Sequence, residues 1–140
     1  MEYRFWVRDI LSAEGCTDCV MISLCLYFLS GHTSTIRYLE AMDASTVVSA
    51  SRDSTIRVWN IDSGTCLHVL SGHTAPIRCL TVCDNLAVSG SLDGTVKVWK
   101  PASGECVHIM QGHGGKIFAV QIARDGNRLA TGDKNGNIIV

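Results

Sequence analysis

The most regular feature of the sequence is a set of short runs in which apolar and polar positions alternate. In residues 54–59 β-branched residues flank the cation Arg57, and residues 94–99 repeat this pattern around Lys97. Further apolar runs lie at 35–39, 47–51, 76–80, 87–91, 116–120 and 129–133, separated by Asp, Gly and Asn. Such runs predict short strands joined by tight turns. We therefore expect an all-β chain, with Arg57 and Lys97 facing outward as surface charges.

The second feature is an internal repeat. Three Gly-His pairs stand 41 and then 40 residues apart, at Gly31-His32, Gly72-His73 and Gly112-His113. Placed in register, the units predict a non-repeat segment at 1–22 and three repeats at 23–60, 64–100 and 104–140. A repeat of this size cannot bury its own hydrophobic face, so the units are expected to stack.

The first two units carry the residues of a WD40 repeat in order: a histidine after glycine, a hydroxyl residue, an aspartate in a turn, and a tryptophan. The third unit keeps the histidine and the hydroxyl residue, at His113 and Thr131. The chain resembles this family over about residues 23–140. The resemblance implies a β-propeller and, in each blade, one buried hydrogen-bonded chain of four side chains. The matching sets are His32-Ser49-Asp53-Trp59 and His73-Ser89-Asp93-Trp99.

Family connectivity, in which the first strand of each repeat closes the preceding blade, sets the expected architecture. It implies a propeller fragment with two complete blades at about 33–70 and 74–110. Residues 24–29 are then an orphan outer strand, and a partial blade begins at about 114. In that blade the register places Asn135, rather than Asp133, at the turn position after Thr131. We expect a truncated gene product, a splice form or a domain fragment.

Composition and net charge exclude some classes of function. The 140 residues are 46% hydrophobic and 18% charged, with a net charge of −1. This balance excludes a nucleic-acid binder that works by bulk electrostatics. The longest apolar run, 19–29, is shorter than the roughly 20 residues that span a membrane. We expect no contact with nucleic acid or membrane.

The seven cysteines do not form a metal-binding pattern. Cys25, Cys66 and Cys106 recur at one repeat position, which favours small buried strand residues. The pair Cys16-x-x-Cys19 has no second pair to complete a zinc site. His68 and His108 recur without a third ligand. We expect no metal and no cofactor, and reduced thiols in a cytoplasmic or nuclear protein.

The recurring Ser, His and Asp residues do not indicate a hydrolase. They are repeated in each unit, lack an oxyanion feature and include a tryptophan with no catalytic role. We expect the protein not to be an enzyme.

Three arginines are expected at one mouth of the propeller. Arg37 and Arg78 each stand five residues after a Gly-His histidine, and Arg52 precedes the turn residue Asp53. A guanidinium group can donate two parallel hydrogen bonds to the oxygens of a phosphate or carboxylate. Such a cluster is therefore a candidate binding site for phosphorylated motifs. The alternative is that these arginines are solvated or paired with acids such as Asp43 or Asp84.

A closer resemblance favours the phosphate hypothesis. Residues 31–37, 47–59 and 66–73 resemble the central repeats of F-box/WD40 proteins, in the branch that reads phosphodegrons for SCF-type ubiquitin ligase complexes. That resemblance implies a protein-binding module of the ubiquitin conjugation pathway that holds phosphothreonine-proline degrons. The matching contact positions are Arg37, Arg52, Arg78, Ser34 and Thr35.

Two other interpretations stay open. One is a phosphate-independent WD40 scaffold that assembles protein complexes, and the other is an inactive truncated form. Residues 1–22 are too short for an F-box, so we expect contacts with the ligase adaptor to be absent from this chain.

Overall fold

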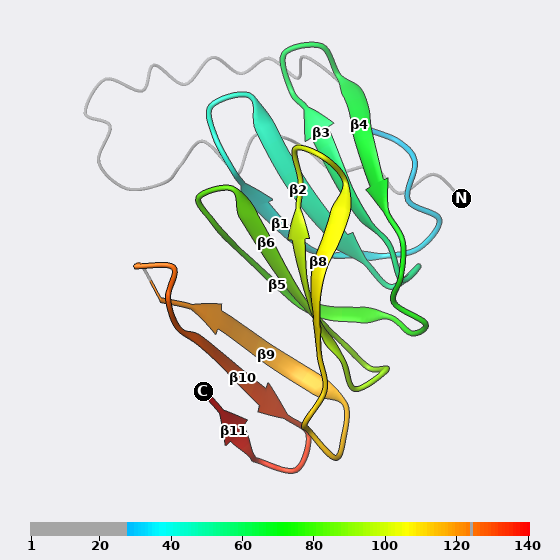
Figure 1. Cartoon of the computed structure of the whole chain (residues 1–140). Coiled ribbons are helices and arrows are strands. Elements are labelled where there is room, and N and C mark those ends of the chain that lie inside the picture. Colours follow the sequence, from blue (N-terminus) through cyan, green and yellow to red (C-terminus); the bar gives the residue numbers. More distant parts are fainter. Residues whose placement is uncertain (1–27, 124) are drawn as a thin grey trace, which may run out of the picture.

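The computed structural model describes residues 28–123 and 125–140, and every regular element among them is a β-strand (Figure 1). The strands form three antiparallel sheets, called blades one, two and three. Blade one contains β1 (Ile36–Ala41), β2 (Thr46–Ser51), β3 (Ile56–Asn60) and β4 (Thr65–Leu70). Blade two contains β5 (Ile77–Cys83), β6 (Leu86–Ser91), β7 (Val96–Lys100) and β8 (Glu105–Met110). Blade three contains β9 (Ile117–Ile122), β10 (Leu129–Asp133) and β11 (Ile138–Ile139).

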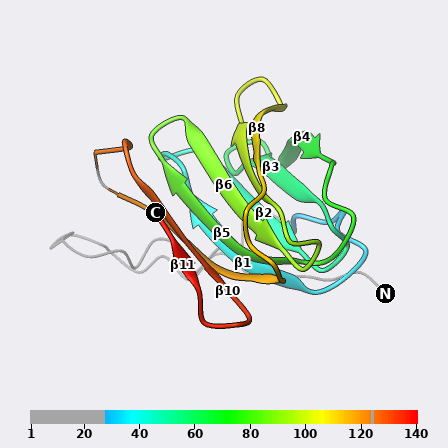
Figure 2. The same ribbon diagram turned by 60° about the horizontal axis from the view of Figure 1, so that its bottom comes forward.

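The blades stack through their first strands. Strand β5 packs against β1 on one side and against β9 on the other, so the three first strands lie next to one another (Figures 1 and 2). Within blades one and two the strands follow chain order from this inner layer to the outer strands β4 and β8. The sequence therefore builds one inner surface from three equivalent strands.

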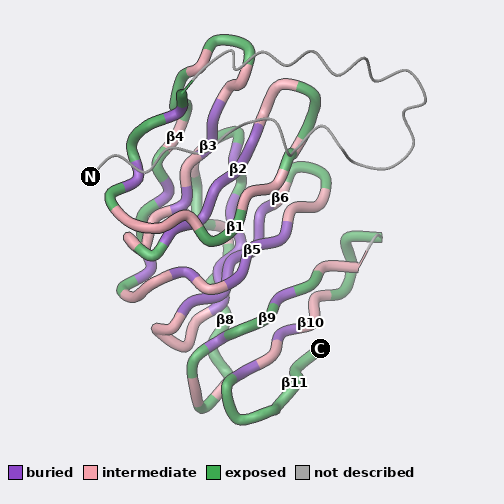
Figure 3. The backbone as a smooth tube through the Cα atoms, turned by 180° about the vertical axis from the view of Figure 1, so that it is seen from behind, coloured by how far each residue is buried: buried purple, intermediate pink, exposed green. Residues whose placement is uncertain are grey.

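The hydrophobic core lies between the sheets. One cluster joins blades one and two through residues such as Val48, Ile56, Leu80 and Trp99, and a second joins blades two and three through residues such as Val98 and Ile117. Figure 3 shows the buried backbone concentrated along β2, β3, β5 and β6. Each blade thus becomes stable only by covering its neighbour.

Blades two and three approach so closely that Gly90 has to be a glycine. A Cβ atom at this position would stand 2.5 Å from Cys79 Sγ and 2.6 Å from Ile117 Cγ2. Both distances are shorter than real contacts of a Cβ atom, so a side chain at Gly90 would force the two inner strands apart.

The expected all-β architecture is confirmed, with two four-stranded blades and a three-stranded third. The orphan outer strand expected at 24–29 falls mostly outside the described residues, as do Cys16, Cys19 and Cys25. The two described members of that strand, Phe28 and Leu29, are not in a strand.

The expectation that Arg57 and Lys97 are plain surface charges is wrong. Lys97 is only 7% exposed and Arg57 is half-buried. The Arg57 guanidinium carbon lies 5.8 Å from the centre of the Trp59 ring. The charged ends of the two side chains lie close to Gly31 and Gly72 respectively, and each of these glycines also lies close to a tryptophan ring, that of Trp59 or Trp99.

The expectation that the periodic cysteines are buried is also wrong for the two that the structure describes. Cys66 and Cys106 are exposed on the outer strands β4 and β8. These strands have no further strand beyond them in their sheets, so much of their surface faces solvent. Each thiol donates to a backbone carbonyl two residues on, at His68 and His108, with sulfur–oxygen distances of 3.4 and 3.5 Å.

Candidate anion-binding site on the inner strands

A buried chain of hydrogen bonds supports the rim of blade one. His32 Nδ1 lies 2.8 Å from Asp53 Oδ2, and His32 Nε2 lies 2.7 Å from Ser49 Oγ. The indole N–H of Trp59 donates to the same hydroxyl oxygen at 2.8 Å. Burial lowers the pKa of His32, so the ring is neutral at pH 7. A neutral ring that donates from Nδ1 and accepts at Nε2 satisfies every member of the chain.

Blade two repeats this arrangement. His73, Ser89, Asp93 and Trp99 are joined by three contacts of 2.8 Å each. Burial acts to raise the pKa of Asp93, but hydrogen bonds from Thr95, His73 and Thr74 outweigh it and lower this pKa to about 2. Both carboxylates are therefore ionised at neutral pH and committed to their own blades, so neither competes for a ligand.

Blade three differs from the sequence-based expectation. Thr131 Oγ1 lies 2.8 Å from His113 Nε2, as the register predicts, but the carboxylate beside the histidine comes from Asp133 and not from the turn position at Asn135. Asp133 takes the place of Ser51 and Ser91 and accepts the backbone N–H of Asn135 through Oδ1. Its Oδ2 atom then faces His113 Nδ1 at 3.2 Å, within ion-pair distance but without the alignment of a hydrogen bond.

The arginines of the inner strands stand at irregularities in strand pairing. In β1 the pairing shifts between Ile36 and Tyr38, which makes Arg37 an extra residue. The same shift in β5 makes Arg78 the extra residue, and in β9 it falls at Phe118. A bulge breaks the alternation of side chains and re-aims the extra one. Each blade therefore presents one such side chain from the same place on the inner layer.

Arg37 and Arg78 line one hollow of about 220 Å³, together with Tyr38 and Phe118. The Arg78 guanidinium carbon lies 5.2 Å from the centre of the Phe118 ring, within the range of a cation–π contact. This hollow thus combines two cations from adjacent blades with two aromatic walls, one of which comes from blade three.

The other expected contact residues lie along the same rim. Arg52 is exposed, does not line the hollow, and donates its backbone N–H to the Thr35 carbonyl at 2.9 Å. The Ser34 carbonyl accepts from Ser51 Oγ at 3.1 Å. These bonds hold residues 34–35 against the end of β2. Arg52 therefore lies beside the residues that lead into β1.

Within residues 28–123 and 125–140, the ion pairs join only histidine to aspartate. Asp43 instead accepts three hydrogen bonds from Ser45 and Thr46 in its own turn. Asp84 is exposed in the β5–β6 turn. In the described part of the chain, none of the three arginines has an acidic partner.

Blade three adds two cations that sequence reasoning does not single out. Lys134 donates its backbone N–H to the Lys116 carbonyl at 2.9 Å, as Arg52 does to Thr35 in blade one and Leu92 does to Pro76 in blade two. The repeat spacing could have found them, because Lys134 follows β10 as Arg52 follows β2. Tyr38 had no such signal, because its place in the hollow depends on the bulge.

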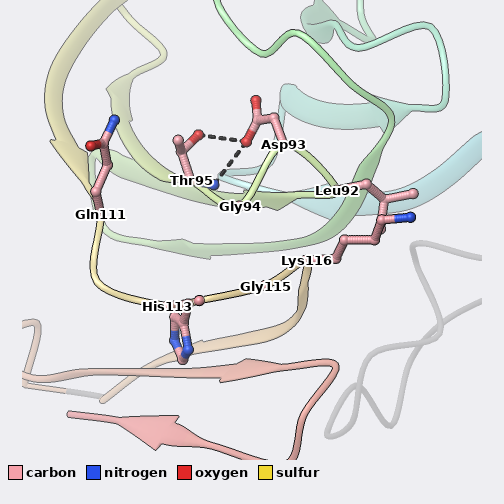
Figure 4. Close-up of a pocket in the computed structure, with 9 residues that line it drawn as sticks. Leu92, Asp93, Gly94, Thr95, Gln111, His113, Gly115 and Lys116 are labelled. Carbon is pink, nitrogen blue, oxygen red and sulfur yellow. Dashed lines mark hydrogen bonds between the residues drawn. The ribbon is translucent and has the colours of Figure 1, made fainter.

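A larger hollow of about 450 Å³ lies between blades two and three, away from the arginines. Figure 4 shows Gln111, His113 and Lys116 on the segment leading into β9, opposite Asp93 and Thr95. Thr95 already donates to Asp93 through both its hydroxyl and its backbone N–H, at 2.7 and 2.8 Å. We consider the smaller hollow the better candidate for an anion, because two arginines and no carboxylate line it, whereas Asp93 lines the larger one.

Comparisons with known proteins agree with the fold. Residues 23–60, 64–100 and 104–140 match the WD40 family model, described as WD domain, G-beta repeat. A stretch of 39 residues is 44% identical to WD repeat-containing protein RUP1 of Arabidopsis thaliana, and covers 28% of this chain and 10% of that protein.

The crystal structure of the computationally designed Ika4 protein superposes with a TM-score of 0.71 and 36% identity. The match covers 78% of this chain and 66% of the designed one, so the present chain spans only part of either relative. No helix in the described residues is long and apolar enough to cross a membrane. Because the family model matches most of its length, the chain belongs to the WD40 repeat family.

Proposed function

We propose that this WD40 module binds phosphorylated peptides, with Arg37 and Arg78 holding the phosphate and Arg52 contributing from the rim. Membership of the WD40 family indicates protein binding in general, because WD40 repeats are generally protein-binding modules. The observation that supports phosphopeptide binding is the hollow that Arg37 and Arg78 line together, where neither has an acidic partner in the described chain.

The chemistry of the hollow favours a phosphate ligand. A phosphothreonine carries about −1.5 to −2 charges at pH 7 and three strong acceptor oxygens. Guanidinium groups match these oxygens with paired N–H donors, and such charge-assisted hydrogen bonds are worth about 1.5–3 kcal/mol each. Ser34 and Thr35 stand beside Arg52 and extend the polar rim on which the peptide backbone would lie.

The resemblance to phosphodegron readers specifies the ligand further. We infer a phosphothreonine-proline degron, delivered for SCF-type ubiquitination. In this proposal the three repeats supply only peptide binding, so ubiquitination requires an adaptor-binding module in addition.

The test is a calorimetric titration with one Thr-Pro peptide in phosphorylated and unphosphorylated forms. We expect binding only to the phosphorylated form, with a roughly tenfold or greater loss in Arg78→Ala and in Arg37→Ala. Arg128→Ala is the matched control, because Arg128 is exposed in the β9–β10 turn at the opposite end of the inner strands. Equal affinity for both peptides, or equal losses in all three variants, would contradict the proposal.

A phosphate-independent protein contact is the second candidate. It is favoured by apolar side chains exposed on the outer strands: Leu67 and Val69 on β4 are 49% and 48% exposed, and Ile109 on β8 is 57% exposed. A partner held there should be lost in Leu67→Ser or Ile109→Ser and retained in Arg78→Ala, the reverse of the phosphopeptide pattern.

A further inference from the structure

Tyr38 occupies an unusual place in the candidate site. In a regular strand successive side chains point to opposite faces of the sheet, yet Arg37 and Tyr38 are adjacent in sequence and line the same hollow. The pairing shift between Ile36 and Tyr38 accounts for this, because it inserts Arg37 as an extra residue. The bulge therefore adds two side chains to the hollow, and not one.

The equivalent residue of blade two behaves differently. Cys79 also follows a bulge, but it is only 3% exposed and packs against Gly90, its partner in the pairing register. Tyr38 is paired in register with Ala50, which has a Cβ atom where blade two has none, and its ring is far larger than a thiol. It is 39% exposed and lines the hollow.

The phenol group of Tyr38 is available to a ligand. Among the described residues, its hydroxyl has no hydrogen-bond partner, while Arg78 on the other side lies over the Phe118 ring. The hollow thus offers two guanidinium groups and one phenol hydroxyl, which can donate a single hydrogen bond.

We propose that Tyr38 is a specificity-determining residue that makes this hollow prefer phosphate over carboxylate. This inference rests on the proposed phosphopeptide function. A phosphate monoester presents three terminal oxygens, whereas a carboxylate presents two. Paired N–H groups from Arg37 and Arg78 can engage two oxygens of either ligand. The Tyr38 hydroxyl donates to the third oxygen, which only the phosphate has.

The test compares Tyr38→Phe with the unchanged chain on two peptides that carry phosphothreonine or glutamate at the same position. Tyr38→Phe keeps the ring and removes only the donor. We expect affinity for the phosphorylated peptide to fall about 3- to 10-fold, with affinity for the glutamate peptide unchanged within about twofold. The preference for phosphate should fall by the same factor.

Control variants separate this role from a structural one. Tyr38→Cys places the blade-two residue in blade one and removes the aromatic wall, so it should weaken both peptides. Thermal melts of each variant establish that the fold is retained.

Two results would overturn the inference: equal losses on both peptides in Tyr38→Phe, or no loss on either. Failure of the unchanged chain to prefer the phosphorylated peptide over the unphosphorylated one would instead overturn the proposed function, and this inference with it.

Discussion

Blades two and three have equivalent inner strands, β5 and β9, and equivalent Gly-His histidines, His73 and His113, but the hydrogen bonds of the two histidines differ. In blade two the Ser89 hydroxyl bonds both His73 and the Trp99 indole. In blade three the Thr131 hydroxyl bonds His113 and the backbone carbonyl of Ile139, the latter at 3.4 Å. The first arrangement links β6, β7 and the segment between β4 and β5 through side chains, whereas the second relies on a backbone group of the short strand β11.

The two blades also differ in how well the third strand is covered. Val96, Lys97, Val98 and Trp99 of β7 are all buried beneath their neighbours, whereas both residues of β11 are exposed. A hydrogen bond between side chains matters most where water cannot replace it. We therefore expect the histidine network to stabilise blade two, with its buried third strand, more than blade three.

The largest expected effect comes from removing the bridging hydroxyl. Ser89→Ala leaves the buried His73 Nε2 and Trp99 Nε1 without their partner, at a cost of about 1–3 kcal/mol for each group. Thr131→Val removes the hydroxyl from His113 Nε2 and from the carbonyl of the exposed residue Ile139, in a less buried blade. We expect urea unfolding to show a loss at least twice as large for Ser89→Ala. Equal losses would break the comparison.

A matched pair of glycines tests the packing between blades. Gly90→Ala should cost about 1–3 kcal/mol by overpacking, because the added methyl meets Cys79 and Ile117. Gly132 has the equivalent position in blade three, where the nearest atom to an added Cβ is Ala119 Cβ at 3.6 Å, an ordinary contact. Gly132→Ala should therefore leave the unfolding midpoint nearly unchanged. A large loss there would contradict the looser packing of blade three.

The pH dependence of stability should come first from the buried histidines. Burial lowers the pKa of His32 and His73 below the ordinary histidine value of 6.5, so the unfolded chain binds more protons than the folded one as the pH falls through this value. Their contribution is fully present above pH 6.5 and is lost progressively below it. His73→Gln should flatten the slope of unfolding free energy between pH 7 and 5, and an unchanged slope would rule out this origin.

We expect a second phase of acid unfolding, at lower pH, from the carboxylates. Hydrogen bonds lower the pKa of Asp93 to about 2, and those from Asn137 first among them lower the pKa of Asp133 to about 2. A depressed pKa contributes stability above the unfolded value near 4, and that stability is lost as the pH falls towards 2. Asp93→Asn should remove part of this phase while retaining the fold at pH 7, as followed by tryptophan fluorescence.

The smallest expected effect concerns the contact between blades one and two. The half-buried Glu40 carboxylate on β1 accepts the Val82 backbone N–H at 2.7 Å, and burial raises its pKa above 4.5. A raised carboxyl pKa favours the protonated form in the fold, so the ionised group disfavours folding at neutral pH. Glu40→Gln keeps an acceptor and removes the charge, so the unfolding free energy should rise or change by less than about 1 kcal/mol. A larger loss at pH 7 would show that the charge itself is required.

The sequence predicts the parts of the fold that repeat. The Gly-His period and the strand pattern give the three sheets and their order, because those features depend on local composition and spacing. The position of Asp133 could not be derived in this way, since the spacing places Asn135 in the turn and only the geometry of the β10 end brings the carboxylate to His113. The burial of Lys97 could not be derived either, because a pattern of alternating polarity does not reveal how far a long charged side chain is covered.

The candidate site was predictable in its charges but not in its shape. The repeat register brought Arg37 and Arg78 to equivalent slots, and the structure places both on one hollow. Arg52 stands on the rim outside that hollow. The place of Tyr38 in the hollow could not be anticipated, because it depends on a bulge in which the strand pairing shifts by one residue.

The most direct test of the central claim is side-chain NMR of the arginines during titration with a phosphothreonine-proline peptide. If Arg37 and Arg78 together bind the phosphate, their Nε–H resonances shift and saturate together, while that of Arg128 in the β9–β10 turn stays unchanged. Peptide binding that leaves both resonances in place would contradict the claim that the hollow between the first two inner strands is the binding site.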